Sequence, residues 1–222
     1  MFLRAIPKKA IAAIALLACL ALAGTIYRLF FVRFARVPTG AMMNTILIGD
    51  RVLITRSFFE IERGSVVTFQ YPNDTEWRIA RVIGLPGESI QIRGRSVLIN
   101  GRELREQKVF ARERDLSSFE PLEGGATEGS GPYKVFYTRG GEPEAVSEDE
   151  TPFASSTPLR LRANEFFLMG DNRDNSEDSR YRGAVPRDRI WGTVGLVYYS
   201  VFVDRESGAE HVRSDRAFTK IR

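Results

Sequence analysis

The sequence predicts a mainly β protein carried on one N-terminal membrane helix. Two observations lead to this fold class. An uncharged apolar run of 18 residues, 10–27, lies close to the N-terminus. Short segments rich in β-branched residues, bounded by Gly, Pro or Asp, follow it along much of the chain. With 222 residues, of which 43% are hydrophobic, the chain is long enough to bury one good core.

The apolar run reads AIAAIALLACLALAGTIY. As a helix it extends roughly 27 Å at about 1.5 Å per residue, close to the thickness of a bilayer's hydrocarbon core. A cleaved signal peptide is one alternative, because Ala21-Leu22-Ala23 resembles the small-x-small cleavage pattern. A lipoprotein signal ending at Cys19 is a weaker one, since Leu17 is large where a small residue is expected. A retained anchor is favoured because apolar residues continue to Val32.

The distribution of charge indicates which orientation and which class of partner to expect. Basic residues flank the apolar run on both sides, so the positive-inside rule hardly separates the two orientations, and the free amino terminus favours an N-terminus inside. The net charge of +4 suits a protein beside an anionic membrane. It is too small to indicate nucleic-acid binding, for which there is also no motif. One cysteine excludes an intrachain disulfide, and a single histidine, His211, argues against a His base or a His/Cys metal cluster.

The predicted strands begin after residue 50. The first four are 51–56, 65–70, 78–84 and 88–93. Next, Asn100-Gly101 is the strongest short signal for a hairpin turn. Residues 102–164 are polar and loop-like apart from one strand at 133–138, and they have too few large apolar residues for a core of their own. We therefore expect an insertion on the β core, followed by a long closing strand at 190–202.

Two loops are similar to binding motifs but fail on spacing. GLPGES, at 84–89, lacks the Gly-Lys-Ser/Thr ending of a phosphate-binding P-loop, and strands flank it. DNRDNSEDSR, at 171–180, lacks the glycine and the glutamate that a calcium loop needs at positions six and twelve. The second loop follows an apolar strand directly. Its Asn, Asp, Ser and Arg residues suit a hydrogen-bonded network that holds a site in shape.

Three segments carry a resemblance to a known family. PTGAMMNTILIGD, ARVIGLPGE and MGDNRDNSEDSRYRG, in this order behind a membrane span, resemble bacterial type I signal peptidase, also called leader peptidase. The resemblance covers the anchor and the β core, and the 102–164 segment least. It implies a signal-peptidase-like β catalytic domain, 37–222, on the outer face of the bacterial cytoplasmic (inner) membrane. Residues 1–36 then form a cytoplasmic tip, a single-pass anchor and a juxtamembrane segment.

The family removes signal peptides from secretory preproteins with a Ser-Lys dyad, without metal or organic cofactor. Its first motif is Pro-Ser/Thr-x-Ser-Met, in which the second hydroxyl residue is the nucleophile. Its second motif begins Lys-Arg, and the lysine is the general base. In this sequence Ala41 occupies the nucleophile position and Ala80 the lysine position, while Asn44 stands where many members have proline. A serine is a poor nucleophile until a base removes its proton. We therefore expect this chain to be inactive.

The alanines at positions 41 and 80 have two alternative origins. Deliberate inactivation is favoured because the supporting residues Ser176, Asp178 and Arg180 are intact. The alternative is a natural pseudoprotease that binds signal peptides or acts as a scaffolding membrane protein. A β-rich anchored scaffold without enzymatic ancestry has little to support it.

The resemblance also implies roles at matching positions. The backbone N–H of Ala41 and the hydroxyl of Thr39 would form the oxyanion hole. Ser176 would orient the lysine amine, and Asp178 and Arg180 would form an ion pair behind it.

Substrate and membrane contacts follow from the same resemblance. The family uses shallow pockets for small side chains at substrate positions −1 and −3. The residues that fall near them here are Val37, Met42, Ile46 and Ile79. Ordinary core packing is the alternative of equal weight for these four. Phe58 and Phe59 are candidates for an apolar surface that lies against lipid.

Overall fold

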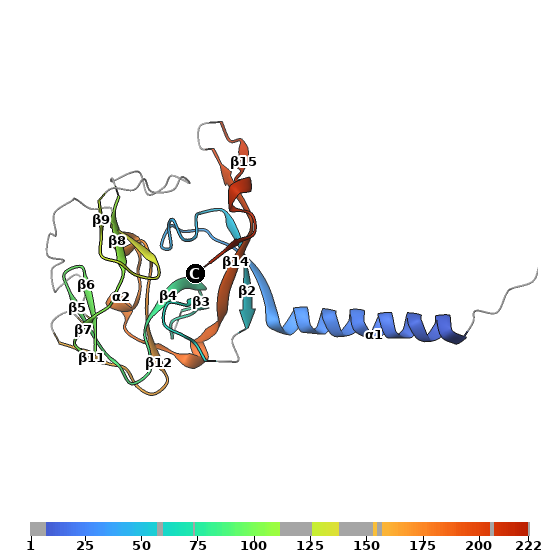
Figure 1. Cartoon of the computed structure of the whole chain (residues 1–222), viewed down its shortest axis with the longest axis horizontal. Helices are drawn as coiled ribbons and strands as arrows, with labels where there is room; N and C mark the ends of the chain where they lie inside the picture. The colour runs from blue at the N-terminus through green and yellow to red at the C-terminus, as the bar shows by residue number, and fades with distance from the viewer. Residues whose placement is uncertain are drawn as a thin grey trace, which may run out of the picture. The chain divides into compact units, whose positions relative to one another are not determined.

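The fold is that of a computed structural model of the chain (Figure 1). The ranges that the structure describes are 8–56, 60–72, 74–111, 126–137, 153–154, 157–204 and 207–221. Phe58 and Phe59 lie outside the described residues, as does a large part of the 102–164 segment.

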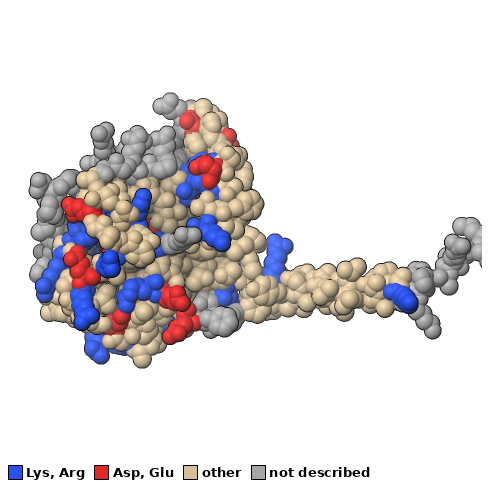
Figure 2. Space-filling view, in the orientation of Figure 1, with Lys and Arg blue, Asp and Glu red and all other residues tan. Residues whose placement is uncertain are grey.

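The first element is α1 (Lys8–Phe31), a helix of 24 residues and therefore about 36 Å long. Ala and Leu, two of the best helix formers, fill it, and it contains no proline. Its apolar side chains point outward on all sides; Leu16, Leu20 and Leu29 are each more than half exposed. Figure 2 shows this apolar stretch between basic residues at its two ends. The helix is long and apolar enough to cross a membrane.

From Phe34 on, the described residues form one compact unit that is built mainly from β-strands. Its largest sheet has the strand order β1-β2-β14-β3-β4-β12-β13, and β15 and β16 also pair with β14. The bounds are β1 (Val32–Arg36), β2 (Asp50–Arg56), β3 (Val66–Phe69), β4 (Arg78–Gly84), β12 (Glu165–Met169), β13 (Val185–Pro186), β14 (Ile190–Val203), β15 (Glu210–Val212) and β16 (Thr219–Lys220).

β14 organises this sheet, and it confirms the closing strand predicted at 190–202. It pairs antiparallel with β2 along one edge and with β3 along the other. Thr193, for example, lies opposite both Thr55 of β2 and Val67 of β3. The four strands predicted first are also confirmed, each within a residue at either end.

Two smaller sheets complete the unit. One has the order β11-β5-β6-β7 and the other β10-β8-β9, in which β8 and β10 run parallel. Their bounds are β5 (Ser89–Arg93), β6 (Ser96–Ile99), β7 (Arg102–Glu103), β8 (Gln107–Phe110), β9 (Thr127–Glu128), β10 (Lys134–Tyr137) and β11 (Leu159–Arg160). The predicted hairpin turn joins β6 to β7. Asn100 and Gly101 there have φ of 51° and 78°, which is the left-handed backbone of a type I′ turn.

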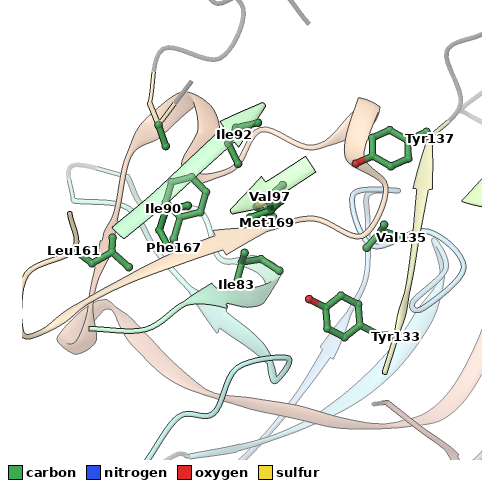
Figure 3. Packing of buried hydrophobic residues seen from close by; sticks show 11 residues of the cluster. Ile83, Ile90, Ile92, Val97, Tyr133, Val135, Tyr137, Leu161, Phe167 and Met169 are labelled. Atoms are coloured by element: carbon green, nitrogen blue, oxygen red, sulfur yellow. The ribbon is translucent and has the colours of Figure 1, made fainter. Parts of the chain in front are cut away.

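The 102–164 segment contains more strand than the sequence predicted. Besides β10, at the predicted 133–138, it holds β7, β8, β9 and β11. Strands of two residues such as β9 are too short to show an alternating pattern. Val135 and Leu161 from this segment pack with Ile83 and Phe167 in one buried cluster (Figure 3). Full burial of each such side chain contributes about 1.5–3 kcal/mol, so the segment completes the core of the same unit.

Candidate active site

The first site segment is the turn between β1 and β2. Two backbone hydrogen bonds close its base: Val37 N–H donates to Asp50 C=O and Gly49 N–H donates to Val37 C=O, both at 2.9 Å. Inside the turn, Met43 N–H donates to Gly40 C=O at 3.0 Å. Ala41 therefore lies on a tightly curled, partly exposed stretch of backbone.

Asn44 has a φ of 72° in this turn. Asn tolerates the left-handed region better than most residues, whereas the ring of proline fixes φ near −65°. A proline at position 44 would therefore exclude the backbone that this turn adopts.

The turn is also held from the C-terminal end of the chain. The Asp50 side chain is fully buried and accepts hydrogen bonds from Leu47 N–H at 2.8 Å and Ser200 Oγ at 2.6 Å. Arg216, in the short helix η3 (Ser214–Arg216), donates to the same carboxylate through Nη2 at 2.6 Å. This carboxylate, buried and paired, fixes the base of the turn to β14 and to the tail.

The second site segment is β4. Ala80 lies opposite Val67 of β3 and is 2% exposed. The next residue, Arg81, is buried on the other side of the strand. Its Nε and Nη2 donate to the two oxygens of Asp171 at 2.8 and 2.6 Å, a bidentate pair. The guanidinium also lies 4.3 Å from the centre of the Tyr133 ring.

The third site segment runs from Gly170 to Arg182 and includes η1 (Arg173–Asn175) and α2 (Ser179–Arg182). Asp178 caps α2 and accepts hydrogen bonds from Gly170 N–H at 2.9 Å and from Arg180 Nε and Nη2 at 2.9 Å each. Burial opposes the charge on Arg180, but the Asp178 carboxylate outweighs that effect and raises the pKa of Arg180. The expected Asp178–Arg180 pair is therefore present and buried.

Asp171 and Asn172 join the three segments. Asn172 N–H donates to Ala41 C=O at 3.0 Å, and its Nδ2 donates to Gly40 C=O at 3.1 Å. Thr45 Oγ1 donates to Asp171 at 2.6 Å, so that carboxylate binds both the turn and β4.

Gly170 is the point where Ala41 and Ser176 approach the same backbone. A Cβ atom there would lie 2.3 Å from Ser176 Oγ and 2.6 Å from Ala41 C=O oxygen. We expect Gly170→Ala to displace both residues and to lower the free energy of unfolding by about 1–3 kcal/mol. Chemical denaturation of the detergent-solubilised chain measures this. Gly195→Ala is the matched control, because its Cβ would meet no atom within 4 Å. Equal costs for the two variants would contradict the prediction.

A cleft of about 430 Å³ lies among these segments. The predicted site residues that line it are Val37, Thr39, Ala41, Met42, Ile46, Ile79, Ala80, Ser176 and Asp178. Arg180 does not line it and lies behind Asp178. Val37, Met42 and Ile46 are also members of a buried core cluster, against which Ile79 packs. These four residues therefore line the cleft and also pack in the core, and their role as substrate pockets stays a prediction.

Residues 8–199 match the family model described as signal peptidase, peptidase S26. The chain belongs to this family. It is 30% identical over 223 residues to the signal peptidase I of Rickettsia typhi, covering 87% of this chain and 80% of that protein. It is 28% identical over 205 residues to the signal peptidase I of Pseudomonas fluorescens, covering 79% and 67%. A crystal structure of a signal peptidase I from Enterococcus faecalis aligns with 62% of this chain and 98% of that one, at 24% identity and a TM-score of 0.35.

Sequence reasoning missed part of the cleft lining in this member of the signal peptidase family. The residues that it did not single out include Arg36, Thr68, Phe69, Glu76, Trp77 and Arg78. Trp77 is 50% exposed, which is unusual for so large an aromatic side chain. The available signal was its position, three residues before Ala80 and directly ahead of a predicted strand.

The chemical groups of the cleft suit binding. Among the described residues that line it there is no lysine and no histidine, and Ala41 and Ala80 contribute methyl groups. Hydroxyl groups come from Thr39, Thr68 and Ser176. The carboxylates in the lining, Glu76, Glu177 and Asp178, each pair with an arginine.

Proposed function

We propose that this chain binds the signal peptides of secretory preproteins in the cleft and does not cleave them. The observation that carries the proposal is that Ala41 and Ala80, at the family's nucleophile and base positions, line one cleft together with Ser176. Peptide hydrolysis by this family needs both lost side chains. Binding needs only the cleft, which the Asp171 and Asp178 contacts hold in place. The proposal is the same for an inactivated enzyme and for a natural pseudoprotease.

The parts of the site that recognise a substrate do not depend on the two alanines. The backbone N–H of Ala41 and the hydroxyl of Thr39 supply the two proposed donors for the carbonyl of the scissile bond. The apolar side chains of Val37, Met42 and Ile79 offer shallow apolar surface for small residues at −1 and −3. Because the two catalytic side chains are replaced while the binding surface is kept, we expect the chain to bind a signal peptide without cleaving it.

The proposed location is the bacterial cytoplasmic membrane. α1 would cross it once with the N-terminus inside, and the β unit would lie on the outer face. Membership of the signal peptidase family and the exposed apolar surface of α1 support this location.

Peptide binding tests the proposal. A labelled signal peptide with Ala at −1 and −3 is compared with the same peptide carrying Leu at both positions, using the full chain in nanodiscs. Fluorescence anisotropy should show at least about tenfold weaker binding of the Leu peptide, because a shallow pocket rejects extra methyl groups at about 1–3 kcal/mol. Empty nanodiscs measure partition of each peptide into lipid. Equal affinities after that correction would remove the pockets from the proposal.

A further inference from the structure

A second cavity, of about 550 Å³, lies where three strands of the main sheet meet. Arg56, the last residue of β2, is opposite Gly192 of β14, and Ile190 of β14 is opposite Phe69 of β3. The short helix η2 (Arg187–Arg189) provides another wall, and Gln70 N–H donates to Arg189 C=O at 3.1 Å. The described residues that line the cavity are Arg56, Gln70, Trp77, Arg187, Asp188, Arg189, Ile190 and Trp191.

The lining of this cavity is basic. It contains three arginines, Arg56, Arg187 and Arg189, against one acidic residue among the described lining, Asp188. Guanidinium groups present planar pairs of N–H donors that match the oxygens of a phosphate. Several of them around one concave surface concentrate anions there. The cavity is therefore suited to a phosphate-bearing ligand, and its volume is within the range of small-molecule sites.

The lining is also rich in tryptophan. The chain has two tryptophans, and both Trp77 and Trp191 line this cavity. Trp77 is half exposed. Indole combines a large apolar ring with one N–H donor, and tryptophan is enriched at the boundary between lipid and water. Arginine beside tryptophan thus favours a phosphate that belongs to a lipid headgroup over one that is free in solution.

The strand order places the cavity at a particular end of the sheet. β1 follows α1 directly in the sequence, and the turn that closes with Val37 and Asp50 connects it to its neighbour β2. The two strands therefore run antiparallel, and Arg56 at the end of β2 lies at the end of the sheet where β1 begins. This is the end of the sheet at which the chain enters the β unit after α1.

We propose that this cavity binds the headgroup phosphate of an anionic phospholipid. The inference rests on the proposed location at the membrane and does not require peptide binding in the cleft, although Trp77 lines both the cleft and this cavity. Arg56, Arg187 and Arg189 pair with the phosphate, and the indoles of Trp77 and Trp191 contact the glycerol region. The site holds the β unit on an anionic leaflet in addition to its covalent anchor.

Tryptophan fluorescence tests this directly, because both tryptophans of the chain are in the proposed site. The full chain in uncharged detergent is titrated with phosphatidylglycerol, with phosphatidylcholine and with inorganic phosphate. We expect a saturable change in tryptophan fluorescence with phosphatidylglycerol only. The double substitution Arg187→Gln and Arg189→Gln should weaken the apparent affinity for phosphatidylglycerol by about 30-fold, which corresponds to about fivefold for each arginine.

Two variants control for folding and for general charge. Arg187→Lys with Arg189→Lys keeps the charge and should keep most of the response. Arg160→Gln with Arg162→Gln removes two arginines that do not line the cavity, and it should leave the response unchanged. Equal responses to the two lipids, or an unchanged response in the Arg187/Arg189 glutamine variant, would overturn the proposal. Saturation by inorganic phosphate at the same concentrations would also overturn it, because the site would then be one for a soluble anion. Loss of peptide binding in the cleft with an intact lipid response would contradict the proposed function but support the lipid site.

Discussion

Ala41→Ser combined with Ala80→Lys is expected to give a chain that cleaves preproteins at least about 10⁴-fold faster than the present one, since a nucleophile and its base act as a unit. Both positions line the same cleft as Ser176. Ala80 is 2% exposed, and its neighbours include the apolar Val67 and Val82, so burial should favour the neutral amine of a lysine there. A neutral amine is what the serine hydroxyl needs as a base. Mass spectrometry of a model preprotein measures the cleavage.

The single reversions are the matched controls for this experiment. Ala41→Ser alone lacks a base and Ala80→Lys alone lacks a nucleophile, so neither should rise appreciably above the present chain. Ser176→Ala in the doubly reverted chain should reduce the rate again, because the lysine amine would lose its orienting hydroxyl. Robust cleavage by the unmodified chain would show that positions 41 and 80 do not have the assigned roles. An inert double variant that still folds and binds peptide would show the same.

Glu106→Ala is expected to lower the free energy of unfolding by about 3–5 kcal/mol, because it leaves a buried guanidinium without its partner. The side chains of Glu106 and Arg173 are 0% and 1% exposed, and Arg173 Nη1 donates to Glu106 at 3.0 Å. Tyr133 Oη lies 3.2 Å from the same carboxylate. Burial opposes the charge on Arg173, yet Glu106 outweighs it and raises the pKa of Arg173 above its ordinary value. Chemical denaturation of the detergent-solubilised chain measures the loss.

Two further variants test whether the loss of stability depends on the burial of the Glu106–Arg173 ion pair. Glu103 pairs with Lys108 at 3.2 Å, but its side chain is 57% exposed, so Glu103→Ala should cost no more than about 1 kcal/mol. Replacing Glu106 and Arg173 together by Met should cost less than Glu106→Ala alone, since no buried charge is then left unpaired. A Glu106→Ala variant as stable as Glu103→Ala would refute this account.

Local features of the sequence predicted much of the fold. The Asn100-Gly101 turn, the apolar helix and the main-sheet strands predicted at 51–56, 65–70, 78–84 and 190–202 each depend on residues close together in the chain, whereas the short strands β1, β13, β15 and β16 were not predicted. The segments around Ala41, Ala80 and Ser176 could be singled out through a family resemblance. Their meeting in one cleft rests on Asp171 and Asn172, whose neighbours in the sequence give no indication of which distant groups they bind.

What the sequence did not reveal depends on contacts between distant residues. Glu106 lies in a polar, loop-like stretch, and its buried partner Arg173 is 67 positions away. The basic cavity likewise brings Arg56 beside η2 only because β2 and β3 both pair with β14. Sheet order decides such pairs, and no local periodicity encodes it.

The Asp50 carboxylate sets the order in which the molecule is completed. It is fully buried, and its paired arginines, Arg213 and Arg216, come from the segment after β14, with Arg216 166 positions later in the chain. A carboxylate without its cation is costly to bury, so the turn that carries Ala41 closes firmly only after the tail has folded back onto β14. The cleft is therefore the last part of the β unit to be completed, because its first motif depends on residues from the opposite end of that unit.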